Sequence, residues 1–306
     1  MGLPIARKKV ELKGVDAVIL GIPFDGRCSF RGGNTRLGPG AIRKLSMLHD
    51  EWNWDTNISF GDYITVKDYG DVDVIFGDPK ATFNRAERKV SDIYEAGAIP
   101  IVLGGDHGIT IPVIWAFSKW VGDKGKIGVI QFDTHVDLEG WPDRPSIGRG
   151  GPMAQILVQK NIDACNVVHF GIRSPRSAKR DFDLRKKAGT VIIPMTEIID
   201  EGIKNCAEKA FEAATYGTDY LYVTLDIDVF DITYAPGTNS PACIGLTSRE
   251  IWQAFHIVTR NGLHGFDFNE LSPLYDTSSG TSALLGARFC REAIDIIASN
   301  KAVNIQ

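Results

Sequence analysis

The sequence lacks a long apolar run, has few cysteines, and carries no excess of charge of one sign. Its 306 residues contain no window of about 18 consecutive apolar residues, so no membrane-spanning helix is expected. The N-terminal segment also lacks the apolar stretch of a secretory signal peptide, which predicts a cytoplasmic protein. The 34 basic and 38 acidic residues leave a net charge of −4, which argues against nucleic acid or a membrane surface as a partner.

Cysteine is scarce, since the chain has five that are widely spaced and no two of them form a CxxC pair. An odd number of isolated cysteines predicts free thiols in a reducing compartment, not a disulfide framework or a thiolate metal site. Hydrophobic residues make up 43% of the chain and charged residues 24%, the ordinary balance of a soluble globular protein.

Short apolar runs rich in β-branched residues alternate with segments of helical character. Such runs suit strands that are buried on both faces of a parallel sheet. The predicted strands are residues 16–24, 98–107, 126–135, 163–173, 189–195, 219–228 and 263–270, and the predicted helices are residues 85–97, 111–122, 202–217 and 248–262. Gly97, Gly122 and Gly262 stand where helices would end, and Ser248 is the expected N-cap of the last helix, without a capping box.

This alternation predicts βαβ units and an α/β fold, with a mainly parallel, doubly wound sheet covered by helices on both faces. At about 150 residues per domain the length allows two domains. No linker-like segment or internal repeat divides the chain, so we expect one domain over residues 1–306. The polar residues 50–80 are interpreted as excursions within that domain.

Histidines and aspartates that could bind a metal follow three of the predicted strands. They are His107 in GGDHG, Asp133, His135 and Asp137 in FDTHVD, and Asp226 and Asp228 in LDIDVFD. Open α/β sheets bind ligands at the carboxyl ends of their strands, which is where all three motifs stand. Because strand residues alternate between faces, Asp133, His135 and Asp137 would point the same way if their strand continued.

A cluster of carboxylates repels itself, and divalent cations remove that repulsion. Carboxylates with some imidazole favour Mn²⁺, with Ni²⁺, Co²⁺, Zn²⁺ or iron as alternatives. Six ligands are more than one ion needs from a protein, whereas two ions that share carboxylates would use them all. One aspartate after a strand is usually a turn or cap residue, so the prediction depends on the joint occurrence of the three motifs.

These motifs resemble those of the ureohydrolases, the arginase and agmatinase family. The matching segments are GGDHGIT at 104–110, FDTHVD at 132–137, TLDIDVFD with the following APG at 224–237, GFDFNELSP at 265–273, and the early segment 21–43. The resemblance spans about residues 16–290, and the sequences of its motifs are more similar to those of agmatinase-like members than to those of arginase.

The resemblance implies a three-layer α/β/α fold and a binuclear manganese centre that hydrolyses a guanidino compound to urea and an amine. One ion would be held by His107, Asp133, Asp137 and Asp226, and the other by His135, Asp133, Asp226 and Asp228. Asp137 would also hydrogen-bond the hydroxide nucleophile. Glu270 matches the family glutamate that holds the substrate guanidinium, and a carboxylate is the natural partner of that planar cation. The resemblance also implies an oligomer, a homotrimer or homohexamer, or a heteromer with a paralogue.

The chain departs from the family where relatives carry a histidine that shuttles protons to the leaving amine. The matching stretch is IGRGGPM at 147–153, and Arg149 occupies the histidine position. Arginine stays protonated and cannot shuttle protons. Arg149 is expected to bind a substrate carboxylate or to shape the cavity mouth, unless it points to solvent. Two smaller departures are Gly108, where relatives have serine, and Ile232, where they have proline.

Arg149 leaves two functions open. The first is a guanidino hydrolase of agmatinase or guanidinobutyrase type, and the second is a catalytically weak or regulatory subunit that acts with an active paralogue. A zinc hydrolase with a single ion is a third alternative, against which the six-ligand set argues. The other histidines, namely His49, His169, His256 and His264, are not expected to be ligands, and His169 is interpreted as a packing residue of a buried strand.

Overall fold

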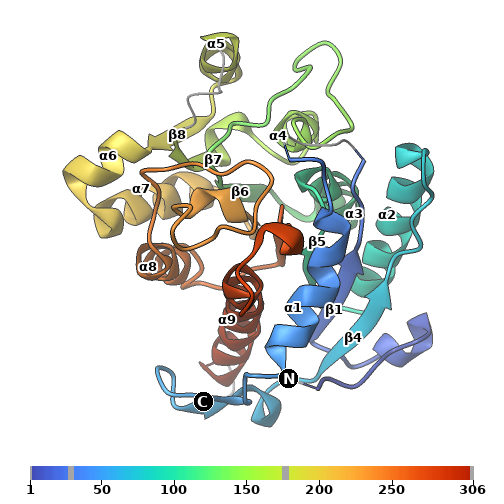
Figure 1. The fold of residues 1–306 in the computed structure, drawn as a ribbon. Coiled ribbons are helices and arrows are strands. Elements are labelled where there is room, and N and C mark those ends of the chain that lie inside the picture. Colours follow the sequence, from blue (N-terminus) through green and yellow to red (C-terminus); the bar gives the residue numbers. More distant parts are fainter. Residues whose placement is uncertain (1, 27–30, 174–178, 304–306) are drawn as a thin grey trace.

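The computed structural model describes residues 2–26, 31–173 and 179–303. Its middle layer is an eight-stranded sheet in the order β4-β1-β5-β10-β9-β6-β7-β8 (Figure 1). All neighbouring strands in it are parallel. The strands are β1 (Ala17–Ile22), β4 (Val66–Asp71), β5 (Ile99–Gly104), β6 (Ile127–Phe132), β7 (Val167–Ile172), β8 (Val191–Pro194), β9 (Tyr220–Asp226) and β10 (Gly265–Asn269).

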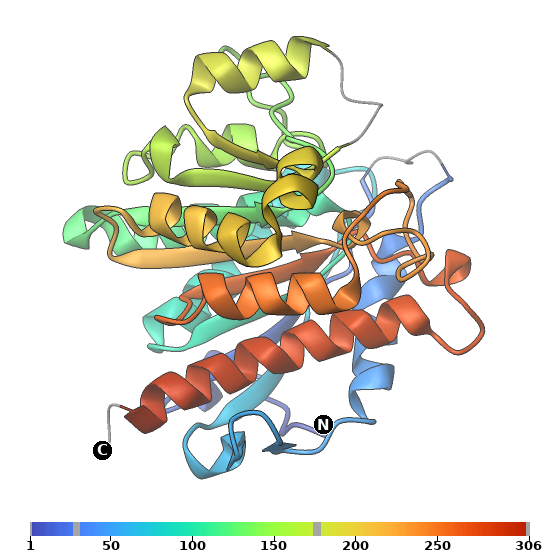
Figure 2. The ribbon, with the colours of Figure 1, turned by 90° about the vertical axis from the view of Figure 1, so that its left-hand side faces the viewer.

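Helices cover both faces of this sheet, as Figures 1 and 2 show. The helices are α1 (Gly38–Ser46), α2 (Pro79–Glu95), α3 (Thr110–Val121), α4 (Pro152–Ile156), α5 (Lys179–Ala188), α6 (Met195–Glu201), α7 (Ile203–Thr215), α8 (Ser248–Val258) and α9 (Thr281–Val303). Strand residues divide between two cores by alternation: Ile101 and Leu103 pack with α1 and α6 to α9, while Val102 packs with α2, α3 and α4. The predicted three-layer α/β/α fold with a parallel, doubly wound sheet is confirmed.

All seven predicted strands are present, each slightly shorter than its apolar run. The predicted N-cap of α8 is wrong, because Thr247 and not Ser248 caps the helix. The Thr247 hydroxyl accepts a hydrogen bond from the Glu250 amide, and the Glu250 carboxylate accepts one from the Thr247 amide. The two residues form a full capping box, which the sequence analysis had not expected.

Residues 50–80, which were interpreted as excursions within the domain, contain three strands. A short antiparallel pair, β2 (Trp52–Asn53) and β3 (Ile58–Ser59), is followed by β4. Strand β4 is the edge strand next to β1, and its outer side is met only by a short parallel bridge from Ile5 to Asp68 within the described residues, so its sequence VKDYGD is half polar. Arg43 of α1 fixes this edge by ion pairs to Asp68 and Asp71.

Helix α9 was not predicted because polar residues interrupt its apolar pattern. It has 23 residues, and Arg291, Glu292 and Asp295 lie buried along it. Of the helices that the structure describes, this one included, none combines the length and apolar character needed to cross a bilayer. The four described cysteines are free thiols, and Cys28 lies outside the described residues. A single domain over residues 1–306 stays a prediction.

Candidate metal centre

The predicted metal ligands meet at the carboxyl edge of the sheet, where β5, β6 and β9 end. His107 begins a short 3₁₀ helix (His107–Ile109) after β5, Asp133 directly follows β6, and Asp226 is the last residue of β9. Five of the six predicted ligands border a cavity of about 250 Å³, whereas Asp133 is fully buried and is not among its lining residues. Its lining residues are His107, His135, Asp137, Glu139, Arg149, Gly150, Asp226, Asp228, Ser240 and Glu270.

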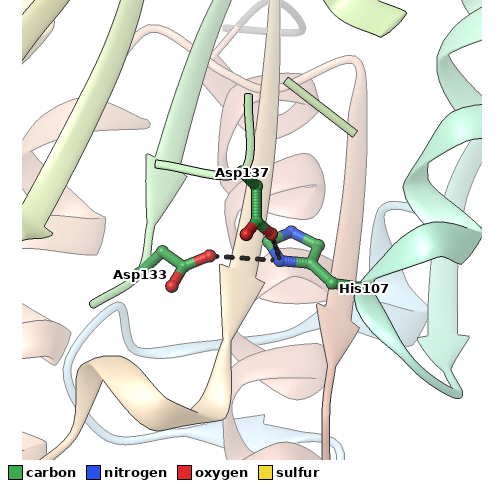
Figure 3. A group of neighbouring side chains, drawn as sticks. All are labelled: His107, Asp133 and Asp137. Carbon is green, nitrogen blue, oxygen red and sulfur yellow. Dashed lines mark ion pairs between the residues drawn. The ribbon is translucent and has the colours of Figure 1, made fainter. Parts of the chain in front are cut away.

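His107 is the centre of the first group of potential ligands (Figure 3). Its Nδ1 atom lies 3.1 Å from Asp133 Oδ2, 3.0 Å from Asp137 Oδ2 and 3.3 Å from an oxygen of Asp226. The same nitrogen is buried and has no hydrogen-bond partner among the described residues. One imidazole nitrogen facing three carboxylates is a donor set that fits a divalent cation.

His135 forms a second group with Asp133 and Asp228. Its Nδ1 atom lies 3.4 Å from Asp133 Oδ1 and 3.2 Å from Asp228 Oδ2. Asp133 thus directs one oxygen toward each histidine, which is the geometry of a bridging carboxylate. Asp226 directs Oδ2 toward His107, while its Oδ1 accepts a hydrogen bond from the Asp228 amide. Asp133 Oδ1 likewise accepts a hydrogen bond from the His135 amide, so the two carboxylates differ in that Asp133 faces both histidines and Asp226 faces His107.

The buried aspartates around His107 and His135 repel one another, so added positive charge would stabilise their ionised forms. Burial raises the pKa of Asp226 well above its usual range, and the Asp228 and Asp133 carboxylates add to the shift. Burial and Asp133 likewise raise the pKa of Asp137. Burial opposes the charged form of His107 too, yet the carboxylates of Asp133, Asp137 and Asp226 raise its pKa well above the usual value. Without cations the cluster must therefore take up protons, and divalent ions would replace them.

Strained backbone sets the direction of two side chains. Asp137 has φ 45° and Glu270 has φ 61°, both in the left-handed region. Each such residue costs on the order of 1 kcal/mol, and residues of this kind cluster at functional sites. The condition under which strand alternation would align Asp133, His135 and Asp137 is not met, since β6 ends at Phe132. A turn, not strand alternation, brings Asp137 to His107.

Glu270 follows β10 and enters the same cavity. Its Oε1 atom accepts a hydrogen bond of 2.9 Å from the His107 amide. Its Oε2 atom is buried without a partner among the described residues. Burial, together with the nearby Asp106 carboxylate, raises the pKa of Glu270 to about 8. A buried carboxylate oxygen with free acceptor capacity is suited to a cationic ligand.

Arg149 lies half-buried in the cavity wall, so the structure does not place it in open solvent. It also borders a second cavity of about 200 Å³, which Asp106 lines from the other side. Gly108 is linked to this placement, because a Cβ atom there would lie 3.2 Å from the Arg149 amide nitrogen. The two departures from the family pattern are therefore neighbours in space.

Several residues at the site were missed from the sequence. Glu139 and Ser240 line the cavity. Glu139 stands two residues after Asp137 in DLEG, a spacing that could have indicated it. Ser240 lies in APGTNSP at 235–241, a segment that resembles the family, but no role was predicted for it.

Arg173 was also missed, although it ends the apolar run VVHFGIR. Its guanidinium donates hydrogen bonds to the backbone carbonyls of Asp228, Val229 and Phe230. It also donates to the carbonyl of Cys243 on the facing loop. A single side chain therefore holds the backbone of Asp228 in place.

His169 is buried on β7, as expected, but it does more than pack. Its Nδ1 atom lies 2.5 Å from Gln131 Oε1, and Gln131 in turn donates a hydrogen bond of 2.7 Å to Asp133. His169 therefore supports the Asp133 carboxylate through one intervening side chain. Within the described part of the chain, none of the four histidines predicted not to be ligands belongs to a group that could hold an ion.

Comparisons with known proteins agree with this geometry. The family model described as the arginase family matches residues 15–295. Guanidinobutyrase from Pseudomonas aeruginosa is 31% identical over 297 residues, which cover 97% of this chain and 91% of the relative. Agmatinase from Bacillus subtilis is 32% identical over 276 residues, which cover 89% of each chain. The solved structure of proclavaminate amidinohydrolase from Streptomyces clavuligerus has a TM-score of 0.87 at 29% identity, and the match covers 98% of this chain and 96% of that one. The expectation drawn from the motifs is confirmed, and the chain belongs to the arginase family of hydrolases.

Proposed function

We propose that this chain is a binuclear metal-dependent amidinohydrolase that converts a guanidino compound to urea and an amine. The observation that carries the proposal is Asp133, whose two oxygens face His107 and His135 from between them. Two divalent ions would be held there, Mn²⁺ with Ni²⁺ or Co²⁺ as alternatives. His107, Asp133, Asp137 and Asp226 would hold one ion, and His135, Asp133, Asp226 and Asp228 the other.

When bound, such a pair of ions supplies a Lewis acid and acidifies water to a nucleophile at neutral pH. The protein groups do the rest. Glu270 accepts N–H bonds from the substrate guanidinium through its free Oε2 atom, which fixes the central carbon in the cavity. Asp137 accepts a hydrogen bond from the nucleophile and holds its proton. Arg149 cannot deliver a proton to the leaving amine, so that proton must come from Asp137 or from solvent.

Urea release tests the proposed reaction. Purified protein loaded with Mn²⁺ is expected to release urea from at least one compound in a panel of agmatine, guanidinobutyrate, guanidinopropionate, arginine, guanidine and biguanides. A folded, metal-loaded chain that releases urea from none of them would contradict an independent enzyme. An inactive chain that raises urea release by an active paralogue above the rate of the paralogue alone would favour the regulatory subunit. The printed names of its relatives put agmatine and guanidinobutyrate first in the panel.

Arg149 is proposed to select the charge of the substrate, because it lines the same cavity as Glu270. Two unit charges about 4 Å apart interact by roughly 4 kcal/mol at an effective dielectric near 20. Even a quarter of that energy changes relative kcat/KM about fivefold. Arg149→His is therefore expected to raise kcat/KM for agmatine and to lower it for guanidinobutyrate. Kinetics on both substrates measure the ratio.

Arg144→His is the control, because Arg144 belongs to the same loop but is exposed and does not line the cavity. It is expected to leave the ratio unchanged. An unchanged ratio in Arg149→His as well would show that Arg149 neither selects substrate charge nor replaces the family histidine.

The assembly and cellular location are also proposals. We infer a homotrimer, a homohexamer or a heteromer with a paralogue, and a cytoplasmic location. Light scattering on the purified chain tests the assembly, and a fully active monomer would refute it.

A further inference from the structure

A buried polar network lies behind His107, on the side away from the carboxylates. It consists of Thr224 on β9 with Asp267 and Asn269 on β10. Thr224 and Asp267 are direct neighbours in the register of the two strands, and both are fully buried. None of the three side chains lines the cavity, so they contact no substrate there. The proposed mechanism gives them no role.

The shortest hydrogen bonds of this network set the direction of the Thr224 hydroxyl proton. Asn269 Nδ2 donates to Asp267 Oδ1 at 2.5 Å and to Thr224 Oγ1 at 3.1 Å, and Thr110 Oγ1 lies farther away, at 3.3 Å from Asn269 Nδ2 and 3.4 Å from Thr224 Oγ1. Thr224 Oγ1 lies 2.5 Å from Asp267 Oδ1, which accepts, so the single hydroxyl proton of Thr224 points to Asp267. Oxygen Oδ2 of Asp267 accepts from the Tyr222 hydroxyl.

The remaining lone pair of Thr224 Oγ1 faces His107 Nε2 at 2.9 Å. A lone pair accepts only from a protonated nitrogen, so His107 must carry a proton on Nε2. In a neutral imidazole, the lone pair then lies on Nδ1, and that is the atom that faces Asp133, Asp137 and Asp226. The network therefore presents the bare nitrogen of His107 to the position where a cation would lie.

We propose that Thr224 and Asp267 are positioning residues that fix the tautomer and ring orientation of His107 for one ion of the pair. The inference rests on the proposed function. No comparable partner for His135 Nε2 is found among the residues that the structure describes, so the network serves the His107 ion and not the His135 ion. Loss of a hydrogen-bond partner behind a metal-binding histidine typically weakens metal affinity by about 10- to 100-fold.

The test is calorimetric titration of the metal-free protein with Mn²⁺. Thr224→Val keeps the shape of the side chain and removes the hydroxyl. It is expected to weaken one of the two binding events by about 10- to 100-fold and to leave the other unchanged. Thr224→Ser keeps the hydroxyl and is expected to restore both events. Asp267→Asn, which keeps an acceptor but loses the charge, is expected to weaken the same event by a smaller factor.

Thr259→Val is the matched control, because Thr259, the residue after α8, is equally buried but its hydroxyl donates to the Phe255 carbonyl of that helix, away from the metal ligands. It is expected to bind both ions as the unsubstituted chain does. Unchanged affinities in Thr224→Val and Asp267→Asn, or equal weakening of both events in them, would overturn the inference. If the unsubstituted chain binds fewer than two ions, the proposed binuclear centre fails instead, so the two failures are distinguishable. Should Thr224→Val not fold, Asp267→Asn and Thr224→Ser still decide the matter.

Discussion

Asp133→Asn is expected to abolish hydrolysis. Asp133 is the only residue common to both groups of potential ligands around His107 and His135, within the described parts of the chain. An asparagine side chain offers one neutral oxygen to one of the two proposed ions. Its NH₂ group would point at the position of the other ion and could not bind it. We expect kcat/KM to fall by at least about a thousandfold, equivalent to roughly 4 kcal/mol of transition-state stabilisation. Urea release and metal content of the purified variant measure the effect.

Asp163→Asn makes the same chemical change at an exposed surface position, where the carboxylate pairs only with Lys126. This control is expected to keep full activity and metal content, because an exposed ion pair contributes little. An Asp133→Asn protein that holds two ions and releases urea at a normal rate would refute the bridging role.

Glu270→Gln is expected to give the second large loss, this time without loss of metal. The carboxylate accepts the His107 amide through Oε1, and a glutamine oxygen can keep that bond. The amide has no charge to hold a guanidinium, and its NH₂ group opposes the substrate N–H donors. Breaking one half of a buried charge pair costs about 3–5 kcal/mol, so kcat/KM should fall by roughly a hundredfold to several thousandfold.

The folded protein should tolerate this substitution well. In the absence of substrate, burial raises the pKa of Glu270 to about 8, so its side chain is mostly protonated at neutral pH and a neutral amide changes its charge little. The midpoint of thermal unfolding is therefore expected to stay the same or to rise. Glu212→Gln on the exposed surface of α7 is the matched control and should change neither activity nor stability. Glu270→Gln with normal kcat/KM would show that the guanidinium is held elsewhere.

The fold could be predicted from the sequence because strands buried in a parallel sheet have continuous apolar sequences, which are easily recognised. The inner strands β1, β5, β6, β7, β9 and β10 lie within apolar runs, since both of their faces are covered by helices, and the edge strand β8 is apolar although it is only partly buried. This apolar pattern is absent from β4, an edge strand whose polar residues also suit a loop, so β4 was not predicted. Helix α9 was not predicted either, because buried Arg291 and Glu292 interrupt its apolar pattern.

The site could be predicted as a set of residues but not as a geometry. The motifs around His107, Asp133 and Asp226 indicated which side chains meet, because carboxyl ends of parallel strands share one edge. The left-handed backbone of Asp137 and Glu270 has no sequence signature when the residue is not glycine or asparagine. Pairing across β9 and β10, which joins Thr224 to Asp267, depends on strand order and register. Those follow only from the assembled sheet.

The most direct test of the binuclear centre is the metal stoichiometry of the unsubstituted chain. Metal-free protein is saturated with Mn²⁺, freed of excess ion, and analysed for metal per chain by mass spectrometry. We predict two ions per chain, because His107 and His135 each face their own carboxylates and share Asp133. A stoichiometry that stays at one or zero under saturating Mn²⁺, Ni²⁺ and Co²⁺ would contradict the account.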